Sequence, residues 1–443
     1  MYPVWVVPYL TSGLVIGLIA SFHILPSHLA VGAFWFNVYL ERKAYREKRP
    51  ELLSFIKRYT LLILIFCFVF GSLSGVGIWY AATVSSPRGI SALIHNYVWG
   101  WATEWVFFLI EVATIYVYYY TFGKVDERTH LRIGYLYAVA AWISMIIITG
   151  ILSFMLTPGR WLETGRFFDG FFNPTYWPQL AARTTLMFGI AGLYALAVAA
   201  TLKHAEVRRE ITRLAGLWGS AGLLLGGLFS AWYLKKLPPE AADFLFGGTL
   251  PYLKTLLYVA VAGWGVTLLY FLIFGLAAPR ANTLFGALAV LVVLFLGIFA
   301  GEGLREGLRR PYIIAGFMYG HQVVGTDLPA KGIKSEVEEL NERGYLSRLG
   351  YLPPALRHPT EENRLETGRI LVAHQCANCH ALTRRGVRSL PRLLEGLGMT
   401  DPEDLAGFLE GLDGYPYMPP FVGTEEERLA AGAFLSTLIR ENP

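Results

Sequence analysis

The residues best suited to chemistry lie in the run QCANCHAL near the C-terminus. Cys376 and Cys379 are separated by two residues and are followed at once by His380. This spacing is the c-type haem attachment pattern, in which two thiols add to the haem vinyl groups and the histidine ligates the iron. A zinc site is the alternative, but it needs two more ligands, and His374 is the only obvious one nearby. The third cysteine, Cys67, lies alone in an apolar stretch and is expected to be a small buried side chain.

A second set of candidates consists of five polar side chains within or beside long apolar runs: His23, His28, Glu104, Glu111 and Glu306. Ionisable groups inside a membrane are costly, so each is a hypothesis about function. Glu104 and Glu111 are seven residues apart, which is two helical turns, and therefore share one helix face. Together, a histidine and carboxylates could ligate haem iron and move protons. Taken singly, each could also be a hydrogen-bonded core histidine or a glutamate paired with another helix.

The composition indicates that these residues belong to a membrane protein. Of 443 residues, 54% are apolar, 15% aromatic and only 16% charged, whereas soluble domains carry about 25% charge. A soluble enzyme, a disordered chain and a nucleic-acid binder are excluded on these grounds, so no nucleic acid partner is expected. Eight runs are long enough to span a bilayer, namely 10–40, 59–83, 97–122, 131–155, 180–202, 214–234, 253–276 and 284–300.

The positive charges predict the orientation of these spans. The odd-numbered loops hold 15 Lys and Arg residues, and the even-numbered loops hold seven, counting Arg183 and Lys254 at helix starts. By the positive-inside rule the odd loops are cytoplasmic. Eight spans then leave the N-terminus and the polar C-terminal tail outside the cytoplasm. We expect a multi-pass protein of the prokaryotic cytoplasmic (inner) membrane.

The sequence therefore predicts an all-α fold with an eight-helix transmembrane bundle and a small helical domain behind it. The expected parts are a membrane domain at 1–312, an extracytoplasmic linker at 313–362 and a cytochrome c domain at 363–443. In the last part, Pro402 after Asp401 predicts a helix start, and the run TEEE at 424–427 predicts a capping box.

The C-terminal domain resembles a small class I cytochrome c. A helix precedes the CxxCH motif, and a Met-Pro-Pro segment begins at Met418, 38 residues after His380. The resemblance implies that Met418 is the second axial ligand; a buried core methionine is the alternative. His/Met ligation raises the haem potential and suits electron transfer.

Over roughly residues 8–320 the chain resembles the large subunit of cytochrome bd quinol oxidases. His23 falls on the haem-ligating histidine of that family, and the run GSLSGVG at 71–77 is similar to its glycine-rich second helix. Glu104 and Glu111, in WATEWVFFLIEVAT, resemble its paired glutamates, although the spacing here is seven rather than eight. The segment EGLRRPY resembles the one whose glutamate, here Glu306, ligates a high-spin haem.

The departures from that family are equally informative. The start of the fifth span, TYWPQLAAR, has no histidine, and the seventh span, LKTLLYVAVAGWG, has no methionine. These are the residues that bind the low-spin b haem in the family. Only 18 residues, KKLPPEAADFLFGGTLPY, stand where the family has its long quinol-binding loop. The low-spin haem and the quinol entry are therefore expected to be lost, and the appended haem c offers another entry for electrons.

The resemblance implies a terminal oxygen reductase of a respiratory chain. Electrons would pass from haem c to one or two high-spin haems (b and/or d) held by His23, Glu306 and Glu104 or Glu111, where O₂ is reduced to water. The glutamates would carry protons, because carboxylates in apolar surroundings are suited to proton relay.

Several further residues enter this hypothesis. Arg309 and Arg310 would neutralise haem propionates, unless they only anchor the chain at lipid headgroups. His28, His95 and His321 are weaker candidates for contacts with a haem.

The expected partners are the lipid membrane, a second membrane subunit such as a related chain, and an external electron donor such as a soluble cytochrome or another respiratory complex. Three alternatives stay open at this point: an electron-transfer subunit without oxidase activity, a reductase of another small ligand such as nitric oxide, and an anchor that only holds the cytochrome c domain.

Overall fold

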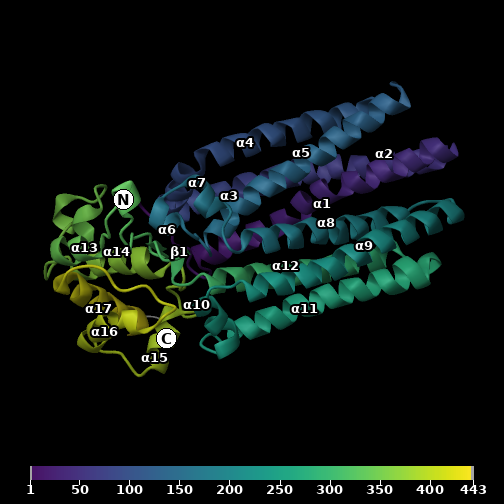
Figure 1. The fold of residues 1–443 in the computed structure, drawn as a ribbon. Coiled ribbons are helices and arrows are strands. Elements are labelled where there is room, and N and C mark those ends of the chain that lie inside the picture. Colours follow the sequence, from purple (N-terminus) through teal and green to yellow (C-terminus); the bar gives the residue numbers. More distant parts are fainter. Residues whose placement is uncertain (1, 441–443) are drawn as a thin grey trace.

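The computed structural model describes residues 2–440. Eight helical rods, long and apolar enough to cross a membrane, run side by side (Figure 1), which confirms the predicted eight-helix bundle. The rods are α1 (Ser12–Glu47), α2 (Pro50–Ile65) continued by the π-helix η1 (Phe66–Gly71) and α3 (Ser72–Ser85), α4 (Pro87–Tyr120), α5 (Glu127–Phe154), α8 (Tyr176–Ala200), α9 (Ala205–Lys235), α11 (Tyr252–Tyr270) continued by η3 (Phe271–Ala277), and α12 (Leu284–Leu308).

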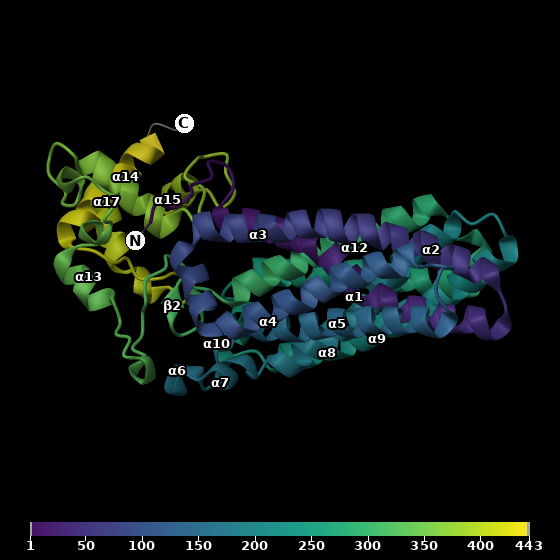
Figure 2. The ribbon, with the colours of Figure 1, turned by 90° about the horizontal axis from the view of Figure 1, so that it is seen from above.

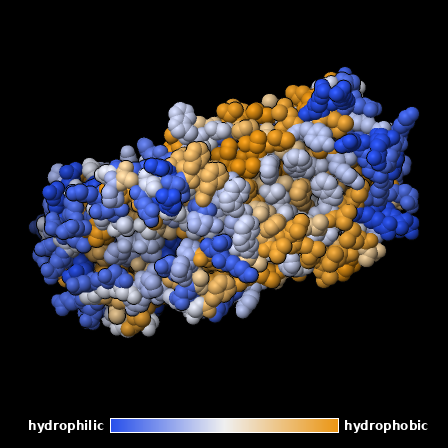
Figure 3. Space-filling view, in the orientation of Figure 1, coloured by the Kyte–Doolittle hydropathy of each residue, from blue (hydrophilic) through white to orange (hydrophobic). Residues whose placement is uncertain are grey.

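The bundle has two polar ends and an apolar middle (Figure 3). The C-terminal part of the chain covers one end, which we call the near end, and the opposite end is the far end (Figure 1). The four odd-numbered loops gather at the far end, where Glu210 forms ion pairs with Lys43 (3.2 Å) and Arg49 (2.5 Å). The basic loops and the C-terminal domain therefore lie at opposite ends of the bundle.

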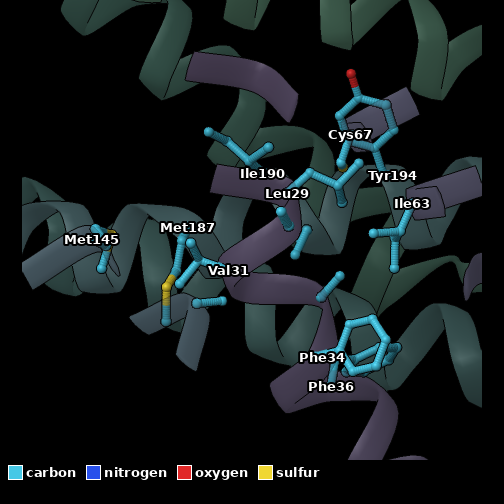
Figure 4. Packing of buried hydrophobic residues seen from close by; sticks show 14 of the residues in the cluster. Leu29, Val31, Phe34, Phe36, Ile63, Cys67, Met145, Met187, Ile190 and Tyr194 are labelled. Carbon is cyan, nitrogen blue, oxygen red and sulfur yellow. The ribbon is translucent and has the colours of Figure 1, made fainter. Parts of the chain in front are cut away.

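Helix α1 lies at the centre of the bundle and packs against α3, α5, α8 and α12. Leu29 and Phe34 are fully buried, and Cys67 also belongs to this core, as expected (Figure 4). Gly32 allows α1 to approach α8 closely, because a Cβ at this position would clash with the backbone carbonyl of Met187. Residues of α1 thus face most of the other spans.

Short elements close the near end of the bundle. They are α6 (Trp161–Thr164), α7 (Phe167–Phe171), α10 (Pro239–Ala242), the π-helix η2 (Asp243–Gly247) and an antiparallel pair, β1 (Tyr312–Ile314) and β2 (Met318–Tyr319). The connection between the sixth and seventh spans folds into α10 and η2. Phe244 and Leu245 of η2 pack with Leu253 and Leu304, and Tyr417 of the C-terminal domain joins this cluster.

The C-terminal domain consists of α14 (Arg364–Cys376), α15 (Leu390–Gly396), α16 (Pro402–Glu410) and α17 (Glu425–Arg440). Its core also takes up side chains from residues 323–352, including the fully buried Leu346. Much of the stretch expected as a linker, with its helix α13 (Val337–Arg343), therefore packs into this domain. The remaining short 3₁₀ turns are η4 (Pro279–Ala281), η5 (Pro329–Lys331), η6 (Leu346–Arg348), η7 (Pro354–Leu356) and η8 (Leu412–Gly414).

Both predicted helix starts in this domain are confirmed. Helix α16 begins at Pro402 behind the N-cap residue Asp401. At the start of α17, Glu427 N–H donates to the Thr424 hydroxyl at 3.3 Å, and Thr424 N–H donates to the Glu427 carboxylate at 3.1 Å. This reciprocal pair is a capping box.

Candidate functional site

The CxxCH motif forms a tight loop at the end of α14. The N–H groups of Cys379 and His380 both donate to the carbonyl of Cys376, at 3.1 and 2.9 Å. The Nδ1 atom of His380 lies 3.1 Å from the carbonyl oxygen of Arg388. A carbonyl only accepts, so Nδ1 carries the proton and Nε2 presents a lone pair. Burial and the Arg310 guanidinium lower the pKa of His380 to about 4, which keeps the ring neutral, as a metal ligand must be.

This loop is docked on the beginning of α1. The Ser12 hydroxyl donates to the side-chain oxygen of Asn378 at 3.0 Å, and the Gly13 N–H reaches the Asn378 carbonyl at 3.4 Å. The Asn378 amide also donates to the carbonyl of Gly320 at 3.1 Å. In Figure 2 the N-terminal segment runs along the C-terminal domain. The motif is thus held against the near end of the bundle through the residue between its two cysteines.

Basic residues at the end of α12 lie next to the same motif. Arg309 and Tyr252 are close enough to Cys379, and Arg310 to His380, for electrostatic interaction. Arg309 also donates to the Ile313 carbonyl at 3.1 Å. Two guanidinium groups therefore lie close to the CxxCH loop.

His23 of α1 packs against the second span. Its Nδ1 atom lies 3.0 Å from the Ser74 hydroxyl. That hydroxyl donates its own proton to the backbone carbonyls of Phe70 and Gly71 (2.8 and 2.9 Å), so it accepts from His23. Nδ1 is then protonated, and within residues 2–440 no hydrogen bond occupies Nε2. His23 and His380 thus adopt the same tautomer, which is the one that ligates metal through Nε2.

The π-helix η1 (Phe66–Gly71) explains how the second span presents Ser74 to His23. One wide turn shifts the register of the following helix, and π-helical turns are frequent at functional sites. Gly75 completes the contact, since a Cβ there would lie 3.3 Å from Cε1 of the His23 ring. The other two glycines of the run 71–77, Gly71 and Gly77, likewise pack closely against α1, at Pro26 and Ile19.

The paired glutamates of α4 meet at one residue of α5. Ser144 donates to Glu104 at 3.0 Å, and its hydroxyl also lies close enough to the Glu111 carboxyl to interact with it. Glu111 is buried, with 6% of its surface exposed. The structure thus brings together two carboxylates that were predicted to share a face, and a hydroxyl joins them.

Glu306 belongs to α12 rather than to the loop behind it, because this helix continues to Leu308 instead of ending near residue 300. Its carboxylate pairs with Arg305 at 3.0 Å and with Arg309 at 2.5 Å. Arg305 also pairs with Glu302 at 3.0 Å. Glu306 therefore lies in an ionic network near the CxxCH motif, and Glu302 is a member that the sequence reasoning missed.

Arg183 is a second missed residue. It was counted with the loop charges as a residue at a helix start, but α8 begins at Tyr176, so Arg183 lies two turns inside the span. Among residues 2–440 its side chain forms one hydrogen bond, which is long, 3.5 Å to the Thr149 hydroxyl. The side chain interacts electrostatically with His23, His28 and Glu302. The sequence did contain a signal for this residue, namely a charged side chain inside an apolar helix of 25 residues.

A third missed cluster lies toward the far end. Glu41 of α1, fully buried, accepts hydrogen bonds from the Tyr118 hydroxyl at 2.6 Å and from Nδ1 of His130 at 2.5 Å. Tyr118 lies two turns beyond Glu111 on α4. This cluster uses the same three helices, α1, α4 and α5, as His23, the two glutamates and Ser144.

The weaker histidine candidates have local partners. His28 is buried and lies 3.1 Å from the Ile24 carbonyl on its own helix. His95 is exposed and lies 2.8 Å from the Ser91 carbonyl one turn earlier. His321 donates through Nε2 to the Pro420 carbonyl at 3.0 Å, two residues beyond Met418. Met418 itself is half-buried in a turn that its N–H closes onto the Tyr415 carbonyl.

The zinc alternative for the cysteine pair finds no support. The ring nitrogens of His374 contact two tyrosine hydroxyls, Tyr345 at 3.3 Å and Tyr351 at 2.7 Å. Across residues 2–440, no group of three or more His, Cys, Asp and Glu side chains is arranged to hold a metal ion. The donor set of one imidazole and two thiols at the CxxCH loop instead fits covalent haem, as the lone imidazole Nε2 atom of His23 fits haem iron.

A partly buried ion pair ties the C-terminal domain to the start of α4. Arg88 donates to both oxygens of Glu336, at 2.9 and 2.8 Å, and Val324 N–H donates to the same carboxylate at 3.0 Å. Burial raises the pKa of Glu336, but the hydrogen bond and charge of Arg88 outweigh it and bring the pKa below its ordinary value. Burial also lowers the pKa of the neighbouring His321 to about 4.

The fold and these residues define a polytopic helical membrane protein with imidazole and carboxylate groups buried between its spans. Residues 12–237, just over half of the chain, match the family model described as cytochrome bd terminal oxidase subunit I. The chain therefore belongs to the cytochrome bd oxidase subunit I family. Members are membrane oxidoreductases that contain haem and work with a second subunit.

Among solved structures, the chain is similar to the bd oxidase from Geobacillus thermodenitrificans. The TM-score is 0.61 at 18% identity, and the match covers 74% of this chain and 91% of that chain. At this identity the likeness shows the fold alone. No curated protein matches the chain in sequence.

Proposed function

We propose that the chain is a terminal oxygen reductase that takes electrons through its own covalent haem c and reduces O₂ to water at haem in the membrane. Cys376 and Cys379 attach the haem c, and His380 and Met418 ligate its iron. In the bundle, His23 ligates a high-spin haem, and Glu306 or Glu104 provides a further ligand. Haem at these places supplies one-electron chemistry and O₂ reduction when bound.

The observation that carries this proposal is the docking of the CxxCH loop on α1. Asn378 is bonded to Ser12 and Gly13, and His23 follows Ser12 on the same helix. Eleven residues of helix correspond to about 16 Å. An appended domain without a role in the bundle would not need its haem motif at the start of the helix that carries the candidate iron ligand.

Other residues of the chain support the reaction by holding protons and charges. Glu111, Ser144 and Glu104 form a chain of proton carriers in the apolar interior. The cluster of Glu41, Tyr118 and His130 provides titratable groups on the far side of Glu111. Arg309 and Arg310 lie where they can pair with haem propionates, through charge-assisted hydrogen bonds.

The proposed topology places the far end in the cytoplasm and the cytochrome c domain outside the cytoplasmic membrane of a prokaryote. Its support is the gathering of the basic loops at the end opposite the C-terminal domain. The expected partners are a second membrane subunit and an external electron donor, such as a soluble cytochrome or another respiratory complex.

A pyridine haemochrome assay with reduced-minus-oxidised spectra of the purified protein tests this function. We expect haem c together with one or two b or d haems, and high-spin features that shift with CO. Haem c alone would overturn the oxidase and leave an electron-transfer subunit or an anchor. CO-sensitive haem with NO reduction but no O₂ consumption would favour the nitric oxide alternative. A phosphatase fused to the C-terminus tests topology, and an inactive but stable fusion would contradict the proposed orientation.

A further inference from the structure

Arg183 is a half-buried cation within a membrane span that the proposed electron and proton carriers do not use. It lies two turns inside α8, in the stretch TYWPQLAAR where the family resemblance would place a haem-ligating histidine. A charged side chain within a span is expensive and persists when it faces a partner or a ligand. The positive charge of this guanidinium therefore requires a nearby anion.

The protein itself balances Arg183 only in part. Within the described residues no carboxylate forms an ion pair with Arg183, and its hydrogen bond to the Thr149 hydroxyl is 3.5 Å long. The nearest acid with which it interacts, Glu302, is already bound to Arg305 at 3.0 Å. The free-energy cost of transferring a charged pair out of water is offset only when both groups have close ionic or hydrogen-bonding partners.

The charges around Arg183 leave a positive excess. Arg183, Arg305 and Arg309 face the two carboxylates of Glu302 and Glu306, and those carboxylates are engaged by Arg305 and Arg309. Arg183 also interacts electrostatically with His23 and His28, and the neutral, metal-ligating tautomer of His23 adds no negative charge. An anion close to His23 would complete this arrangement.

We propose that Arg183 binds a carboxylate of the haem held at His23. This rests on the proposed function, since it requires haem at that histidine. A guanidinium is suited to this task, because it stays charged and binds a carboxylate through two N–H groups. Arg183 is then a haem-binding residue that also raises the midpoint potential, because a nearby positive charge favours the reduced form.

Redox titration of the membrane haem, with haem quantified by pyridine haemochrome, tests this inference. Arg183→Gln removes the charge and keeps much of the side chain, whereas Arg183→Lys keeps the charge. Arg160→Gln, exposed at the near end, is the matched control. The haem c band serves as an internal measure of folded protein.

We expect Arg183→Gln to lower the midpoint potential of the membrane haem or to reduce its amount several-fold relative to haem c. Arg183→Lys should restore most of the potential, and Arg160→Gln should match the wild type. Unchanged potential and haem content in Arg183→Gln would overturn the inference, even if the variant melts at a lower temperature. Absence of membrane haem from the wild type would instead overturn the proposed function, so the two failures are distinguishable.

Discussion

The hydroxyl of Ser12 donates a hydrogen bond of 3.0 Å to the side-chain oxygen of Asn378. Ser12 is the first residue of α1, and Asn378 lies between the two cysteines of the CxxCH motif. Because α1 also carries His23, one rigid helix connects the proposed haem c to the proposed site of O₂ reduction. The helix thereby holds the proposed haem c, where electrons enter, at a fixed position relative to the proposed haem at His23, where they reduce O₂.

The Ser74 hydroxyl sets the orientation and tautomer of His23, so its removal should weaken haem binding. In Ser74→Ala the Nδ1 proton loses its partner at 3.0 Å, and losses of this kind cost about 10–100-fold in metal affinity. We expect a lower ratio of membrane haem to haem c by pyridine haemochrome. Ser72→Ala, on the same helix, is the control. Equal haem ratios in the two variants would show that His23 does not depend on Ser74.

Glu111 should control turnover without controlling haem content. Glu111→Gln keeps the size and polarity of the side chain beside Ser144 but removes the titratable proton. We expect the rate of O₂ consumption to fall by a factor of about 10² or more, with unchanged haem spectra. Glu127→Gln, exposed at the far end, is the control. Wild-type turnover in Glu111→Gln would exclude this glutamate from the proton path.

Met418 should set the potential of haem c. In Met418→Ala the iron loses its thioether ligand, and His/Met ligation is what raises the potential. We expect potentiometric titration to give a lower midpoint for haem c, with covalent attachment retained. Met399→Ala tests a second half-buried methionine of the same domain and should leave the midpoint unchanged. A shift in Met399→Ala alone would reassign the axial ligand.

Docking of the C-terminal domain should weaken in acid. His321 has a pKa lowered by burial to about 4, against an ordinary value of 6.5. Its stabilisation is therefore complete above pH 6.5 and is lost as the pH falls toward 4, where protonated Nδ1 becomes a buried donor without a partner. Glu336 also stabilises the docked state less as the pH falls. Because its pKa is lowered, its ion pair with Arg88 is lost only at still lower pH.

Limited proteolysis or amide exchange of residues 313–336 between pH 7 and pH 4 measures this effect. We expect protection to decrease across that range and His321→Asn, which does not titrate, to remove the upper part of the pH dependence. The same pH profile in wild type and His321→Asn would assign the effect to other groups.

The sequence was sufficient for the parts of the molecule that depend on local pattern. Apolar runs of bilayer length predicted the eight spans, and the Thr424–Glu427 spacing predicted the capping box. The shared face of Glu104 and Glu111 followed from helix geometry alone. The end of α12 was misplaced because Glu302, Arg305 and Glu306 make its last two turns polar, although they neutralise one another within the helix.

What the sequence could not predict depends on contacts between distant segments. Ser74 is 51 residues from His23, and Ser144 is 40 residues from Glu104, so neither stood out as a partner. Arg183 was counted among the loop charges as a residue at a helix start, because the span was predicted to begin at 180, whereas α8 begins four residues earlier, at Tyr176. Glu41 and His130 lie just outside the predicted spans 10–40 and 131–155, and only the packing of α1 against α5 reveals that they are buried together.

The central claim is that haem c delivers its electrons to the site at His23, and one stopped-flow measurement tests it directly. The wild-type protein and the His23→Ala variant are fully reduced and mixed with O₂, and oxidation of haem c is followed by its absorbance. We predict rapid oxidation of haem c in the wild type and a haem c that stays reduced in His23→Ala, with the CO-induced spectral change also lost. Equal rates of haem c oxidation in the two proteins would contradict the account.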